Sequence, residues 1–258
     1  MFGYAGQILY VNLSTGKSKV ETVDESFLKK FIGGLGVGLK LWLDNAPSGV
    51  DPLNEENPIV LALGPVTGTI FPTGGIGHVF VSKSPASGAV AGAVSQGSFG
   101  AELKRAGYDA IVITGKSSKP VYLWLDDVST QLLDATKFSG KSSSETEDMI
   151  KTDLGDYYIR VASIGIAGEK LSKIATITNE KTRTAGRIGL GAVMGSKNLK
   201  AIAVRGTRDV TVAEPAEFME MVKDFHERMK SNATDKYTNI GTVKDLMVYN
   251  KLHCLPTR

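Results

Sequence analysis

The chain has 258 residues, enough for one large domain or for one domain and part of another. Hydrophobic residues make up 42% and charged residues 22%, an ordinary globular composition that excludes a wholly disordered chain. The net charge of +3 argues against a polyanion-binding protein, and the single cysteine excludes an intramolecular disulfide. Because no apolar stretch approaches the roughly 20 residues of a membrane span and the N-terminus shows no secretory signal, we expect a cytoplasmic protein without nucleic-acid or membrane partners.

The N-terminal part predicts two strands, a helix and a third strand. Residues 7–12 and 18–23 read as strands around the turn signal Ser14-Thr15-Gly16. In residues 27–39, apolar side chains recur at helical spacing, and the glycines among them are tolerable if another backbone packs closely against the helix. The apolar run 58–63, ended by a Gly-Pro pair, predicts a buried strand.

The chain also resembles itself. Residues 99–115 match residues 190–206 without a gap, and each copy predicts a glycine-rich loop, a short helix and a buried strand. Strand, turn, strand and helix precede the match in both halves. We therefore interpret residues 1–207 as a duplicated α+β domain built from β-α-β units, with repeats at about 1–116 and 117–207. Chance similarity is the alternative.

After Gly206 the pattern becomes helical. Glu214-Pro215 predicts a helix start, and the apolar residues between 218 and 229 lie on one face. Residues 208–258 therefore predict the start of an all-helical domain, cut short at Arg258, whose apolar face needs a partner.

Glycine-rich clusters at 73–77, 95–97, 183–187 and 189–191 are the candidates for chemistry. Loop glycines free backbone N–H groups to bind an anion, and a following helix N-terminus adds positive potential. The clusters before the two repeated helices suit a ligand with two phosphate-bearing arms, and Arg183 and Arg187 can bind phosphate. The alternative is that the glycines only permit tight turns. P-loop, Rossmann and serine-hydrolase motifs are absent, and we predict no catalytic or metal-ligating side chains in this chain.

Specific motifs are spread along the chain. The longest runs from Ala185-Gly186-Arg187 to Ala203-Val204, and the others are residues 6–8, 11–16, 63–69, 72–75, 83–85, 99–104, 106–110, 163–165, 167–169 and 255–258. In these motifs the chain resembles the N-terminal part of the tungsten-dependent aldehyde ferredoxin oxidoreductases.

The resemblance implies a two-sheet base under a bis-pterin cofactor that holds tungsten, or molybdenum as the alternative. It places the cofactor-binding residues in three segments, which are Gly75, Ile76 and Gly77; Val94, Ser95, Gln96 and Gly97; and Arg183, Thr184, Gly186 and Arg187. The family reaction oxidises an aldehyde to a carboxylate and passes electrons through a [4Fe-4S] cluster to ferredoxin.

The same resemblance suggests further partners. The cluster ligands would lie beyond Arg258, so we expect the chain to need its own further helical domains and to be inactive alone. A homodimer is a further partner that the family suggests.

Two positions depart from the family pattern. Ile76 stands where an arginine is common, and Val94-Ser95-Gln96 stands where Asn-Ser-Gly is frequent. These departures favour a second hypothesis, a non-catalytic scaffold or binding module that has lost the pterin. An independent nucleotide-binding protein is the third hypothesis.

Overall fold

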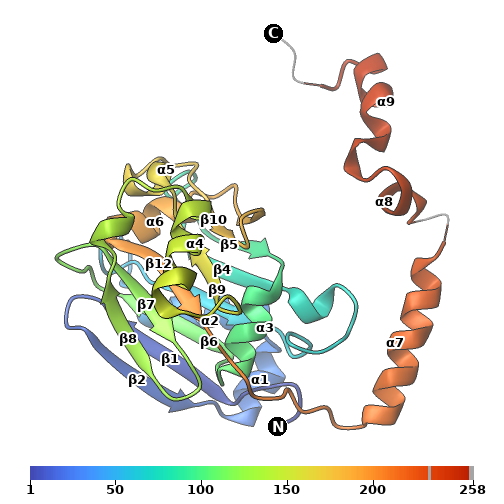
Figure 1. Ribbon diagram of the computed structural model, residues 1–258, viewed down its shortest axis with the longest axis horizontal. Helices are drawn as coiled ribbons and strands as arrows, with labels where there is room; N and C mark the ends of the chain where they lie inside the picture. The colour runs from blue at the N-terminus through green and yellow to red at the C-terminus, as the bar shows by residue number, and fades with distance from the viewer. Residues whose placement is uncertain (232–233, 256–258) are drawn as a thin grey trace. The chain divides into compact units, whose positions relative to one another are not determined.

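The computed structural model describes residues 1–231 and 234–255 (Figure 1). The chain divides into two compact units, Met1–Ala213 and Glu214–Arg258. The boundary that the sequence places after residue 207 and the repeat boundary near residue 116 stay predictions. Residues 256–258, part of the last family-like motif, lie outside the described residues.

The first sheet of the N-terminal unit has six strands. Their order across the sheet is β2 (Lys17–Thr22), β1 (Gln7–Asn12), β6 (Ala110–Thr114), β3 (Ile59–Leu63), β4 (His78–Lys83) and β5 (Val90–Ser95). Strands β1 and β6 are parallel, and the other neighbours are antiparallel. The two hairpin strands and the buried strand expected from the sequence are all in this sheet.

The second sheet repeats this arrangement. Its order is β8 (Thr130–Asp134), β7 (Val121–Leu125), β12 (Leu199–Val204), β9 (Arg160–Ser163), β10 (Ile177–Asn179) and β11 (Arg183–Ala185). Again one pair, β7 with β12, is parallel and the others are antiparallel. The predicted α+β class with two related sheets is confirmed.

The inner faces of the two sheets share one core. Helices α3 (Ser98–Arg105) and α6 (Leu190–Ser196) contribute to it, and its members include Leu9, Phe80, Phe99, Ile111, Leu123, Ile177, Val193 and Ile202. Burying apolar side chains is the dominant favourable contribution to folding, so this shared core makes the two sheets one unit.

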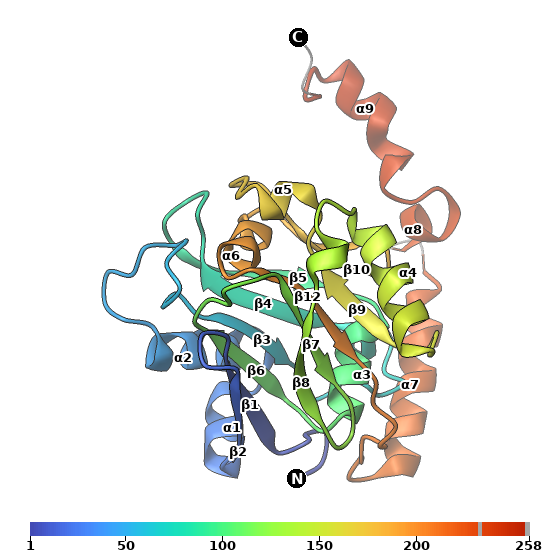
Figure 2. The same cartoon turned by 60° about the vertical axis from the view of Figure 1, so that its left-hand side comes forward.

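Helices cover the outer faces. On the first sheet lie α1 (Glu25–Phe31) and α2 (Gly34–Asn45), and on the second lies α4 (Ser143–Leu154) (Figure 2). The capping box of Ser142 and Glu145 explains why α4 begins where it does. Shorter helical segments are η1 (Gly74–Ile76), η2 (Thr136–Phe138) and α5 (Ile166–Glu169).

The single helix expected over residues 27–39 is wrong, because the structure has two helices there. Between them Ile32 adopts a φ of 62°, outside the helical region. A Cβ atom on Gly33 would lie 2.7 Å from the carbonyl oxygen of Leu63. Glycine at 33 therefore permits the backbone at Leu63 to approach closely, as expected from the glycines in this segment. The helix is interrupted at the same point.

A buried ion pair anchors the N-terminal segment. The Lys104 ammonium at the end of α3 contacts the Asp109 carboxylate, and their side chains are only 1% and 3% exposed. Asp109 also accepts hydrogen bonds from the backbone N–H groups of Ala5 (3.1 Å) and Gly6 (2.6 Å). Burial lowers the pKa of Lys104, and the charge of Asp109 partly offsets this shift. One carboxylate thus joins α3 to the segment that leads into β1.

Replacing Asp109 with alanine is expected to lower the free energy of unfolding by about 3–5 kcal/mol, because it leaves a buried ammonium without its partner. Urea denaturation followed by circular dichroism measures the change. The matched control is Glu21→Ala, which breaks the exposed pair with Lys19 (2.6 Å) and should cost about 1 kcal/mol or less. Equal effects of the two substitutions would contradict this role of Asp109.

The C-terminal unit is helical in its described part. It contains α7 (Pro215–Met229), α8 (Asp235–Asn239), η3 (Thr242–Asp245) and α9 (Leu246–Lys251), and proline opens α7 as the sequence predicts. Within residues 1–231 and 234–255, none of the helices has the length and apolar character that crossing a membrane requires.

Candidate functional site

Strand pairing places two of the three predicted segments side by side. His78, the first residue of β4, pairs with Ser95, the last residue of β5. Because the strands are antiparallel, residues 75–77 enter the sheet where residues 96–97 leave it. Within these segments Ile76, Val94 and Gln96 are exposed, whereas Ser95 and Gly97 are buried.

The third segment meets the second across the two sheets. Strands β5 and β11, each the last strand of its sheet, lie next to one another. Between them is a pocket of about 440 Å³, lined by Gly92, Ala93, Val94, Thr184, Gly186, Arg187 and Ile188. Four of the predicted site residues, Val94, Thr184, Gly186 and Arg187, therefore share one pocket. The other seven, Gly75, Ile76, Gly77, Ser95, Gln96, Gly97 and Arg183, are not among its lining residues.

The two sheets contribute different side chains to the pocket and to the surface around it. Arg183 opens β11 and Arg187 follows that strand; both are exposed, and their guanidinium groups make no ion pair or hydrogen bond within the part of the chain that the structure describes. Arg187 also has a φ of 76°, a conformation that costs a non-glycine residue about 1 kcal/mol or more. On the first sheet, Val94 is 66% exposed and Ile76 is 38% exposed. The β11 segment thus contributes the cations, and the first half of the chain contributes the exposed apolar side chains.

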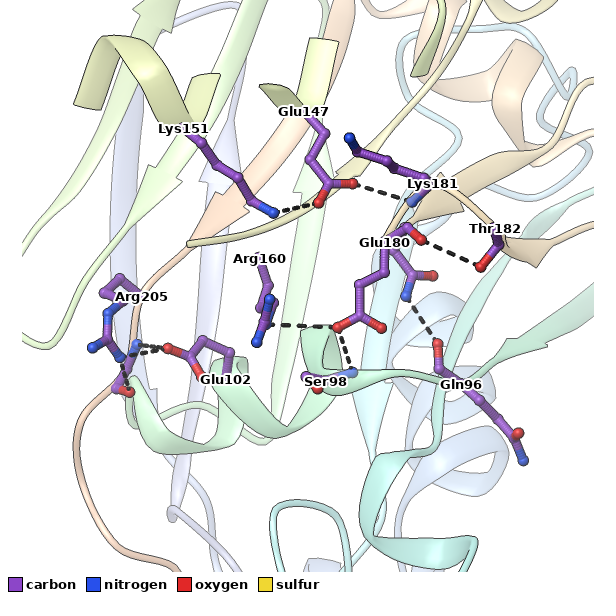
Figure 3. A network of polar contacts seen from close by, with 12 residues as sticks. Gln96, Ser98, Glu102, Glu147, Lys151, Arg160, Glu180, Lys181, Thr182 and Arg205 are labelled. Atoms are coloured by element: carbon purple, nitrogen blue, oxygen red, sulfur yellow. Dashed lines mark hydrogen bonds and ion pairs between the residues drawn. The ribbon is translucent and has the colours of Figure 1, made fainter. Parts of the chain in front are cut away.

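The loop before α3 is held by the second sheet, which the sequence did not predict. The Asn179 amide donates to the carbonyl oxygen of Gln96 (2.8 Å), and the Ser95 hydroxyl donates to Asn179 Oδ1 (2.7 Å). The backbone N–H of Ser98, at the start of α3, donates to Glu180 Oε1 (2.8 Å) (Figure 3). This amide, which the sequence offered to an anionic ligand, is therefore bound to a carboxylate of the chain itself.

A corresponding contact exists at the other repeated helix. Ser84, after β4, donates through its hydroxyl to the carbonyl oxygen of Ile188 (2.8 Å), just before α6. Near the start of α6, the N–H of Gly191 donates to the carbonyl oxygen of Ala175 (3.0 Å). The residue after β4 thus contacts the segment just before α6, and the residue after β10 contacts the start of α3. Spacing in the sequence carries no signal for these contacts, because the partners lie about 80–100 residues apart.

His78 lies in the core beneath the loop before α3. It is 3% exposed, its ring centroid is 5.8 Å from that of Phe80 and 5.3 Å from that of Phe99, and neither ring nitrogen has a hydrogen-bond partner among the described residues. Burial lowers the pKa of His78 to about 4. A neutral imidazole is therefore built into the core.

This histidine makes stability depend on pH in a defined window. With an ordinary pKa of about 6.5 in the unfolded chain and about 4 in the folded one, the unfolded chain binds more protons between these values. The stabilising contribution is complete above pH 6.5 and is lost as pH falls toward 4, by about 2 kcal/mol between pH 6.5 and pH 5. Urea denaturation at these two pH values measures it. His78→Leu should flatten that difference, and an unchanged difference would refute the assignment to His78.

Within the described residues, no three His, Cys, Asp or Glu side chains are placed to hold a metal ion together. The site therefore consists of a pocket between two edge strands, two unpaired guanidinium groups, and a loop fixed by Asn179 and Glu180.

Several known proteins are similar to this chain over most of its length. The tungsten-containing aldehyde ferredoxin oxidoreductase of Pyrococcus horikoshii is 45% identical over 260 residues, which cover 100% of this chain and 43% of that protein. The WOR-like subunit of the aliphatic sulfonate oxidoreductase of Pyrococcus furiosus is 37% identical over 260 residues, covering 93% of this chain and 41% of that subunit. The chain thus spans less than half the length of these relatives.

A solved structure has the same fold. In the active site complex BamBC of benzoyl coenzyme A reductase, in complex with 1,5-dienoyl-CoA, one chain aligns with a TM-score of 0.87 and 33% identity, over 94% of this chain and 37% of that one. Residues 8–206 match the family model described as the N-terminal domain of aldehyde ferredoxin oxidoreductase. By this match and the identity to its curated relatives, the chain belongs to the aldehyde ferredoxin oxidoreductase family.

Proposed function

We propose that this chain is the cofactor-binding N-terminal part of a tungsten bis-pterin oxidoreductase, with molybdenum as the alternative metal. The observation that carries the proposal is the pocket between β5 and β11, which Arg187 lines and which Arg183 adjoins through its neighbour Thr184. The guanidinium groups of both arginines have no partner among the described residues. A phosphate-bearing ligand would satisfy these groups, since guanidinium binds phosphate through two parallel hydrogen bonds.

The residues of the site fit such a ligand. The guanidinium groups of Arg183 and Arg187 would bind phosphate, and Thr184 and Gly186 would offer hydroxyl and backbone contacts beside them. Val94 would cover an apolar part of the ligand from the first sheet, while residues 95–97 and 75–77 would present backbone groups at the neighbouring rim. When bound, the metal pterin supplies the two-electron oxidation of an aldehyde to a carboxylate. This chain binds and orients it.

In this proposal, residues outside this chain bind the iron–sulfur cluster and carry out electron transfer to ferredoxin. A [4Fe-4S] cluster is commonly held by four cysteines, and the chain has only Cys254. Electrons would pass to ferredoxin through a cluster bound by further helical domains, so the 258 residues alone would not turn over. A homodimer of the complete protein is part of the same proposal.

A scaffold without pterin is the second candidate, and one observation favours it. Ile76 and Val94, both exposed, give the first sheet's side of the site an apolar surface without a cation. If the pterin were absent, this surface and the pocket would serve assembly with another part of the protein.

Tungsten content separates the two candidates. The full-length natural protein that contains this chain, produced with tungstate, should carry about one tungsten per protein by mass spectrometry, together with a fluorescent pterin after acid oxidation. Arg183→Ala with Arg187→Ala should reduce the retained tungsten at least about ten-fold, because two charge-assisted contacts to phosphate are lost. Arg228→Ala, an exposed arginine of α7, is the matched control and should leave the content unchanged. Folded wild-type protein without metal or pterin would favour the scaffold.

A further inference from the structure

The turn between β10 and β11 adopts a conformation that needs support. Glu180 and Lys181 have φ values of 49° and 61°, so two consecutive non-glycine residues lie in the left-handed region. Such residues persist where the surroundings hold them, and they concentrate at functional sites. This turn directly precedes Arg183–Ala185, the strand that borders the pocket.

Helix α4 provides that support. Glu147 of α4 is buried and accepts a hydrogen bond from the backbone N–H of Lys181 (3.2 Å), while Lys151 balances its charge (2.5 Å) (Figure 3). Within the turn, the N–H of Thr182 donates to the carbonyl oxygen of Glu180 (2.6 Å). The left-handed turn is therefore held by helix α4, which covers the second sheet, and by a hydrogen bond within the turn itself.

The supported turn holds the loop of the other sheet at three points. Glu180 accepts from the N–H of Ser98, and Asn179, which is 1% exposed, bonds both Ser95 and the carbonyl oxygen of Gln96. Arg160 lies 3.6 Å from the Glu180 carboxylate, close enough to balance its charge. The three contacts bracket residues 95–98, so the backbone of this loop has little freedom to move away from the pocket.

Gly97 completes the fit between loop and turn. Its φ is 109°, and a Cβ atom there would lie 2.0 Å from Glu180 Oε2. Any side chain at 97 would displace the carboxylate from the start of α3. The glycine and the glutamate are therefore complementary parts of one contact between the two sheets.

We propose that Asn179 and Glu180 are positioning residues for the cofactor site, which hold residues 94–97 in the shape that binds the ligand and couple this loop to the arginine segment 183–187. The positioning role rests on the proposed function, whereas the hydrogen bonds that hold residues 95–98 do not depend on it. Because the turn leads directly into β11, one rigid element places the cations of the second sheet and the backbone of the first sheet's loop relative to each other. Neither residue contacts the reacting atoms in this account.

The first measurement is made on the cofactor-free full-length protein. Glu180→Ala removes the acceptor of the Ser98 amide, so hydrogen–deuterium exchange in a peptide covering residues 94–100 should accelerate at least ten-fold. Glu180→Gln keeps an oxygen that can accept this bond, so it should restore most of the protection. Unchanged exchange in Glu180→Ala would overturn the holding contact whatever the protein binds.

The second measurement is tungsten retained per protein after gel filtration. Glu180→Ala should retain at least five-fold less than the wild type, and Glu180→Gln should retain an intermediate amount. The matched control is Glu102→Gln in α3, the helix whose first amide Glu180 binds; the Glu102 carboxylate binds Arg205 (2.7 Å) away from the loop. It should lower the melting temperature at least as much as Glu180→Gln while keeping the wild-type tungsten content.

The outcomes separate the inference from the function. A wild type that carries tungsten and a folded Glu180→Ala variant that retains it equally would overturn the positioning role and leave the proposed function standing. If Glu180→Ala does not fold, Glu180→Gln decides, and tungsten loss no greater than in Glu102→Gln would overturn the role. A wild type without tungsten or pterin would overturn the proposed function and the positioning role of Asn179 and Glu180 together, even if exchange confirmed the contact between Glu180 and Ser98.

Discussion

The inner faces of the two sheets bury each other, and the rest of the structure depends on that shared core. Leu9 and Ile111 of the first sheet and Leu123 and Ile202 of the second belong to the same buried cluster. Helices α1, α2 and α4 cover the outer faces, while α3 and α6 pack within the shared core, so each sheet removes its inner face from water by packing against these two helices and the other sheet. The pairing also brings β5 and β11 together, and the candidate site exists only because these two edges meet.

Polar contacts determine how the two sheets are aligned, which the apolar core alone does not specify. Hydrophobic contacts are non-directional, whereas hydrogen bonds require a particular geometry. At the site, Asn179 and Glu180 bind the backbone of the opposite loop. At a second junction, the buried ammonium of Lys197 donates to the carbonyl oxygen of Glu55 (2.6 Å), and burial lowers the pKa of this lysine to about 8. Such bonds fix the relative position of the two sheets.

The two halves of the N-terminal unit are alike in strand order and different in chemistry. The strand orders correspond, yet the arginines of the pocket region come from the second sheet and the exposed Val94 from the first. Related backbones can therefore present unlike surfaces to one ligand. In the proposed function, a two-armed cofactor would meet charge from one half and apolar contact from the other, with the turn at Glu180 keeping the halves in register.

Local periodicity and glycine positions were enough to predict the α+β class and the hairpin and buried strand near the N-terminus, because these features are recorded in neighbouring residues. It was glycine positions, too, that drew attention to the segments of the predicted site. The sequence-based prediction was wrong about helix continuity near Ile32, where the approach of the Leu63 backbone decides. That Val94 and Arg187 share a pocket, and that Glu180 binds the first amide of α3, became visible only in the folded chain. Those contacts join residues more than 80 positions apart, and no local pattern records which distant surfaces meet.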